Sequence, residues 1–143
     1  MNAGALAPLL VAASAAIILL LGLVHLLYTF RGVKLHPRDA KLVAAMRQVS
    51  PVLTRQTTMW KTWVGFNASH SLGAMLFGAV YGYLALMQGA FLFQSWYLLL
   101  VGLAMLAAYA FLGWRYWFSV PFRGIVLATV LYAAALAMIA AGA

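Results

Sequence analysis

The chain has 143 residues, of which 67% are apolar, nine are Lys or Arg and only one, Asp39, is acidic. Soluble domains are about half apolar, so this composition, with a mean hydropathy of +1.01, excludes an ordinary soluble protein. The absence of cysteine excludes disulfides, thiolate nucleophiles and cysteine metal ligands. No nucleic-acid recognition motif accompanies the basic residues, so we expect membrane lipids with anionic headgroups as partners and no nucleic acid.

Four apolar segments are long enough to cross a bilayer, which requires about 20 residues. They predict transmembrane helices at about residues 3–29, 61–87, 91–114 and 122–142, with a connection at 30–60. The first lacks a basic n-region and exceeds the length of a signal-peptide core, so we expect a retained span. Short connections make successive helices antiparallel neighbours. The predicted fold is therefore an all-α, antiparallel four-helix bundle forming a single transmembrane domain over residues 1–143.

The basic residues predict the orientation of this bundle. Seven of the nine lie at residues 31–61, between the first two spans, and the other two, Arg115 and Arg123, lie between the last two. Because connections rich in Lys and Arg stay in the cytoplasm, both basic connections are expected there. Both termini are then expected outside, on the periplasmic or extracellular side.

The long connection contains a helical pattern. Pro37 can start a helix and Pro51 can stop one. Between them, apolar residues recur at a helical spacing: Leu42, Ala45, Met46 and Val49. This predicts a short cytoplasmic interfacial helix at about 38–49. Ser50 and Pro51 also fit the N-cap and first turn of a further helix, which would continue unbroken into the second span and exceed about 30 residues. We expect His36 to be a solvated surface residue.

The second predicted span has an unusual polar face. At 100° per residue, Asn67, His70 and Ser71 share one side of the helix. Hydrocarbon does not solvate these groups, so this face is expected to contact protein or a cavity. Another face repeats small residues that allow close approach of a second backbone: Gly65, Ser69 and Gly73. We therefore expect the helix to be central in the bundle or in a homo-oligomer or larger membrane complex.

His25 in the first span adds to this polar group. Counted at 1.5 Å per residue from the nearest basic residue, His25 and His70 lie about 9 and about 14 Å above the cytoplasmic boundary. If they face each other, they could flank a haem iron or bind a metal. The alternatives are a structural polar cluster and a pocket for an organic ligand. A metal needs three or four donors, so we predict no dedicated metal site.

These residues lead to two functional hypotheses. In the first, an intramembrane pocket lined by His25, Asn67, His70 and Ser71 opens toward the cytoplasm and binds a small hydrophobic or amphiphilic ligand or cofactor. His70 is the best candidate for acid–base catalysis, but no intramembrane carboxylate orients it, and whether the protein is an enzyme stays open. Four cations are expected to ring the opening and contact an anionic group: Arg55, Lys61, Arg115 and Arg123. In the second hypothesis, the chain is a non-catalytic accessory or assembly subunit.

The chain also resembles known membrane proteins. Residues 50–86, above all the Gly-Phe-Asn-Ala-Ser-His-Ser-Leu-Gly segment at 65–73, with residues 35–39 and 115–117, resemble a group of small bacterial four-helix inner-membrane proteins. This resemblance implies a bacterial inner-membrane location and no particular activity.

In layout alone, the chain is similar to the eicosanoid and glutathione metabolism membrane enzymes and to the styrene oxide isomerases. Both are small four-helix trimers with sites at subunit interfaces, which bind glutathione and haem respectively. This similarity offers His70 as the haem-binding position. The acidic residue that the glutathione enzymes carry early in the second span has no counterpart in this sequence. Likeness at the level of the fold does not by itself assign an activity.

Overall fold

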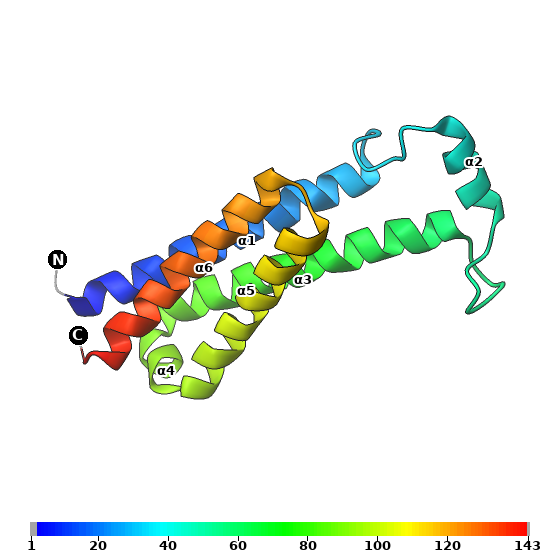
Figure 1. Cartoon of the computed structure of the whole chain (residues 1–143). Helices are drawn as coiled ribbons and strands as arrows, with labels where there is room; N and C mark the ends of the chain where they lie inside the picture. Colours follow the sequence, from blue (N-terminus) through cyan, green and yellow to red (C-terminus); the bar gives the residue numbers. More distant parts are fainter. Residues whose placement is uncertain (1–2, 143) are drawn as a thin grey trace. The chain divides into compact units, whose positions relative to one another are not determined.

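A computed structural model describes residues 3–142, with side chains from Leu6 onward. These residues are 82% helical and contain no strand. The helices are shown in Figure 1: α1 (Ala3–Phe30), α2 (Ala40–Gln48), α3 (Met59–Met87), α4 (Gly89–Gln94), α5 (Trp96–Tyr116) and α6 (Ser119–Ala140).

Four of these helices, α1, α3, α5 and α6, are long and apolar enough to cross a membrane. In each of them only 28–33% of the most apolar stretch is buried inside the protein. Most of the apolar surface therefore faces outward, as contact with lipid requires. The prediction of an all-α fold with four helices long and apolar enough to cross a membrane is confirmed for the described residues.

The third span begins later than predicted. Residues 89–94 form the separate short helix α4, and α5 starts at Trp96 instead of about residue 91. Ser95 divides the two helices because its backbone is extended and its side chain accepts a hydrogen bond from the Leu98 N–H at 3.3 Å. Gln94 and Ser95 are the only polar residues between Gly89 and Gly102, so the average hydropathy of the segment stays high and does not reveal this break.

The connection contains the predicted short helix. In α2, the Asp39 carboxylate caps the first turn by accepting from the Lys41 N–H at 2.8 Å. The prediction that Ser50 and Pro51 begin the second membrane helix is wrong, because α3 starts only at Met59. The Met59 N–H donates to the Val49 carbonyl at 2.8 Å, which closes the intervening residues into a loop.

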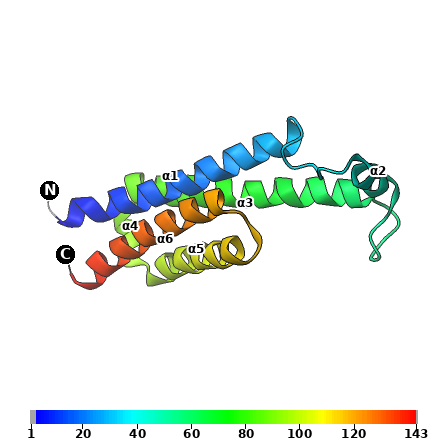
Figure 2. The same cartoon turned by 45° about the horizontal axis from the view of Figure 1, so that its top comes forward.

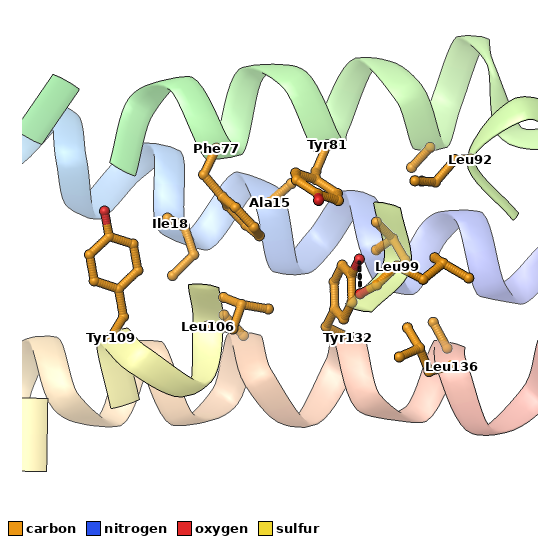
Figure 3. Packing of buried hydrophobic residues seen from close by; sticks show 14 of the residues in the cluster. Ala15, Ile18, Phe77, Tyr81, Leu92, Leu99, Leu106, Tyr109, Tyr132 and Leu136 are labelled. Atoms are coloured by element: carbon orange, nitrogen blue, oxygen red, sulfur yellow. Dashed lines mark hydrogen bonds between the residues drawn. The ribbon is translucent and has the colours of Figure 1, made fainter. Parts of the chain in front are cut away.

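The described chain divides into two compact units, one formed by residues 3–21 and 74–142 and the other by residues 22–73. The first unit contains the apolar core, to which α1, α3, α4, α5 and α6 all contribute (Figure 3). The views in Figures 1 and 2 agree that α1 begins and α6 ends at the same end of this unit.

Three aromatic residues organise the centre of this core. Tyr132 is fully buried and donates its hydroxyl to the Leu99 carbonyl at 3.1 Å (Figure 3). Tyr81 donates to the Leu98 carbonyl at 2.7 Å, and its ring meets that of Tyr132 edge-on, with centroids 6.0 Å apart. Phe77 stacks on Tyr81 at 4.6 Å. Since hydrocarbon offers no partner to a phenol, these bonds to carbonyls make the buried hydroxyls tolerable.

Gly78 sets the closest approach between α1 and α3 in the first unit. A Cβ atom built on Gly78 would lie 2.6 Å from the Ala15 carbonyl oxygen and 2.8 Å from the Leu19 backbone nitrogen. Both neighbours are backbone atoms, so no rotation of a side chain would make room. The two helices therefore pack backbone to backbone at this point, as small residues permit in membrane helices.

Ser14 of α1 is the exception to the pairing of buried polar groups. Its Oγ is buried and lacks a hydrogen-bond partner among the described residues. Because an unpaired buried hydroxyl costs about 1–3 kcal/mol, Ser14→Ala should leave the free energy of unfolding unchanged or raise it by about 1 kcal/mol. Denaturation in detergent, followed by circular dichroism, measures this change. A clear loss of stability would mean that the hydroxyl has a partner in the membrane.

Candidate functional site

The second unit, residues 22–73, brings the predicted polar residues together. His25 comes from the last turns of α1, and Asn67 and His70 come from the first half of α3. The residues between them form the connection that contains α2.

Asn67 is the centre of this group. Its Nδ2 donates to the Trp63 carbonyl, one turn earlier in α3, at 2.8 Å. A carbonyl accepts only from the amide N–H, so this bond fixes the orientation of the amide and leaves Oδ1 for His25 Nε2, 2.9 Å away. Since Oδ1 only accepts, His25 Nε2 carries the hydrogen and donates it.

His70 also contacts the His25 imidazole. The ring centroids of His25 and His70 are 5.4 Å apart, and the ring planes meet at 82°. The structure therefore satisfies the condition set from the sequence, that the two histidines face each other. Together with Asn67 they form a continuous polar cluster, here called the His25–Asn67–His70 cluster.

The cluster does not fit a haem held between its two histidines. An edge-to-face pair at 5.4 Å is in van der Waals contact, which leaves no space for a macrocycle between the rings. In addition, His25 Nε2 is already bonded to Asn67. Among residues 3–142, no three His, Asp or Glu side chains are grouped in a way that could hold a metal ion.

The serines beside His70 bond to their own helix. Ser71 is buried, and its hydroxyl donates to the Asn67 carbonyl at 2.8 Å. Ser69 is exposed and donates to the Phe66 carbonyl at 3.1 Å. This is the common way to satisfy a serine hydroxyl within an apolar helix. The Ser71 hydroxyl therefore bonds to the backbone of Asn67 within α3.

A small recess lies next to Asn67. Its volume is about 10 Å³, which is enough for roughly one water molecule. Residues from the end of α1, from the connection before α2 and from the start of α3 line it: Thr29, Leu35, His36, Trp60, Trp63, Val64 and Asn67. Of these, the sequence pointed only to Asn67 as a site residue.

The connection folds onto the start of α3 beside this recess. The Trp63 indole N–H donates to the Leu35 carbonyl at 3.1 Å. The His36 ring packs edge-on against Trp60 with centroids 4.7 Å apart, and the Arg47 guanidinium lies over the same indole at 5.4 Å. The expectation that His36 is simply solvated is therefore wrong. The sequence signal that could have revealed this packing is the pair of tryptophans at the start of α3.

The four predicted cations are divided between the units. Arg55 and Lys61 belong to the second unit, and Arg115 and Arg123 belong to the first. All four are exposed, and the Arg115 guanidinium lies 5.4 Å from the centre of the Tyr116 ring.

The small-residue face of α3 is open at its start. Gly65 is exposed, and no described atom comes within 4 Å of a Cβ built on it. Ser69, one turn further, is also exposed. At these two positions the predicted close helix approach is not made by the described part of the chain itself.

No protein-family model, curated protein or solved structure matches this chain. The resemblance to small bacterial inner-membrane proteins therefore stays a prediction.

Proposed function

We propose that this membrane protein binds a small amphiphilic molecule at the His25–Asn67–His70 cluster, on the cytoplasmic side of a bacterial inner membrane. The polar group of the ligand enters the recess beside Asn67. Its apolar part lies along the outside of α3, in contact with the bilayer. In this proposal His70, which contacts His25 in the cluster, is the residue able to exchange a proton with the bound group.

The observation that carries the proposal is the incomplete bonding of Asn67. A side-chain amide has two N–H donors and an oxygen with two lone pairs. Asn67 uses one N–H for the Trp63 carbonyl and one lone pair for His25. One N–H and one lone pair remain at a residue that lines the recess. In hydrocarbon, unused capacity of this kind favours a bound polar group.

The dimensions of the recess indicate what kind of ligand would bind. Sites that enclose a whole small molecule have volumes of about 300–1,000 Å³, whereas this recess has about 10 Å³. It accepts one hydroxyl, carbonyl or amine group. The nearby Trp63 and Phe66 side chains are 43% and 71% exposed, and they offer an apolar surface to the remainder of a membrane-dissolved molecule.

The proposed orientation follows from charge. The basic residues lie in the two connections that are predicted to be cytoplasmic. Arg55 and Lys61 are exposed in the unit that contains the cluster. An amphiphile with an anionic group would be held there by charge-assisted hydrogen bonds. In the proposal, Arg115 and Arg123 contribute to the same cytoplasmic boundary.

Asn67→Leu tests this function directly. The variant keeps the size of the side chain and removes its hydrogen bonds, so we expect retention of the co-purifying amphiphile to fall about tenfold or more. The measurement is mass spectrometry of extracts from protein purified in a mild detergent. Ser69→Ala on the same helix is the matched control and should keep the ligand.

Two results would contradict the proposal. One is equal amounts of every extracted molecule in wild type and Asn67→Leu, with both proteins eluting as the same folded species. The other is loss of the amphiphile in Ser69→Ala to the same extent as in Asn67→Leu.

The open face at Gly65 favours a second candidate, an accessory subunit that packs α3 against another membrane helix. Gly65 and Ser69 are exposed and have the spacing that lets two backbones approach. In that case Gly65→Leu would dissociate a complex that survives purification, while Asn67→Leu would leave the extracted lipids unchanged.

A further inference from the structure

The second unit contains a larger cleft, between residues 33–38 and α2. Its volume is about 560 Å³. Apolar and basic side chains both line it: Val33, His36, Pro37, Arg38, Val43 and Arg47. We propose that this cleft binds the phosphate group of an anionic phospholipid, with Arg38 and Arg47 on the phosphate and with Val33 and Val43 against the glycerol and upper acyl chains.

The cleft carries two positive charges, and no carboxylate among its lining residues neutralises them. Arg38 and Arg47 are both exposed and both line the cleft. The chain has a single acidic side chain, Asp39, and its carboxylate accepts from the Lys41 N–H as the cap of α2. Two guanidinium groups therefore share one cleft that is lined by no carboxylate. A phosphate diester is the anion that membrane lipid supplies, and guanidinium is well suited to bind it.

Arg47 is held in position for this role. Its guanidinium lies over the Trp60 ring at 5.4 Å, and the His36 ring packs edge-on against that indole at 4.7 Å. A guanidinium with one face on an aromatic ring keeps its N–H groups, which lie in its plane, available for an oxyanion. Because Trp60 limits its motion, Arg47 loses less side-chain entropy on binding.

The exposed apolar residues of the connection that contains the cleft favour a lipid over a soluble phosphate. Val33 is 73% exposed, Leu53 is 94% exposed and Val52 is fully exposed. Exposed apolar side chains interspersed with Lys and Arg are typical of a surface that rests on a bilayer. These residues would be costly in water, but they are satisfied when the connection lies on the membrane, where the cleft meets lipid headgroups.

Lipid binding to purified full-length protein tests this site. We would titrate the protein in detergent with phosphatidylglycerol or phosphatidylcholine and count bound lipids by native mass spectrometry. Wild type should bind one phosphatidylglycerol about tenfold or more tightly than phosphatidylcholine. The Arg38→Gln/Arg47→Gln variant should lose that preference. Arg31→Gln/Lys41→Gln removes the same charge from exposed residues of the same unit that do not line the cleft, and it should keep the preference.

Arg38→Gln alone guards against a folding artefact, because Arg47 also packs on Trp60 whereas Arg38 is exposed. It should weaken phosphatidylglycerol binding severalfold while elution volume and helicity stay unchanged. The proposal is overturned if both double variants lose the same affinity, which would indicate a general charge effect. It is also overturned if millimolar inorganic phosphate displaces the bound phosphatidylglycerol, because the cleft would then be a site for a soluble anion.

Discussion

Gly78→Ala is expected to lower the free energy of unfolding by about 3 kcal/mol, the upper part of the range for overpacked cores. The added methyl group would lie 2.6 Å from the Ala15 carbonyl oxygen and 2.8 Å from the Leu19 nitrogen. Backbone atoms cannot rotate away, so α1 and α3 must separate. This loss outweighs the roughly 1 kcal/mol that alanine gains over glycine within a helix.

Gly82→Ala is the matched control, one turn further along α3. A Cβ there would meet the Ala15 Cβ at 3.7 Å, an ordinary contact. We therefore expect it to unfold at the same denaturant concentration as wild type or at a slightly higher one. Titration with a denaturing detergent, followed by circular dichroism, compares the variants. Equal stability of Gly78→Ala and Gly82→Ala would show that α1 and α3 do not meet at Gly78.

Tyr132→Ala is expected to destabilise the protein by about 3–5 kcal/mol, as for other large buried aromatic residues. Tyr132 is fully buried, bonds to the Leu99 carbonyl and fills the space that Gly102 leaves open on α5. Helices in lipid gain little from hydrophobic transfer, so the cost arises from the lost packing contacts around the cavity. The same detergent titration measures it.

Tyr132→Phe measures the contribution of the hydroxyl to stability separately from that of the ring. It removes only the bond to the Leu99 carbonyl and should cost about 1 kcal/mol. Tyr83→Ala, at a tyrosine of α3 that is 58% exposed, controls for the loss of an aromatic side chain and should change stability little. If Tyr132→Ala lowered the free energy of unfolding no more than Tyr83→Ala does, this would contradict the packing of α5 and α6 around the Tyr132 ring.

The four long helices could be predicted from the sequence because each is a long segment of high mean hydropathy. The sequence did not predict the break at Ser95, where a side-chain bond from the Leu98 N–H starts a new helix inside a segment of high average hydropathy. It also placed a possible start of the second membrane helix at Ser50. The bond from the Met59 N–H to the Val49 carbonyl closes these residues into a loop instead, and such local bonds carry no hydropathy signal.

For the candidate site, helical periodicity and depth were enough to relate His25 to Asn67 and His70. They could not give the orientation of the amide, which depends on the Trp63 carbonyl. They also could not show that His36 and Arg47 pack on Trp60, because these contacts join residues from a loop, a short helix and a long helix. Irregular segments place their side chains through tertiary packing, and the sequence pattern alone does not specify it.

The most direct test of the proposed binding site is a cryo-EM map of the full-length protein in lipid nanodiscs, detailed enough to show the Asn67 amide. We expect a discrete non-protein density in the recess, with one polar atom about 3 Å from Asn67 and an apolar tail along Trp63 and Phe66. The account would be contradicted by a map in which a neighbouring protein helix fills that position, or in which ordinary acyl chains cover Asn67 without any bound polar group.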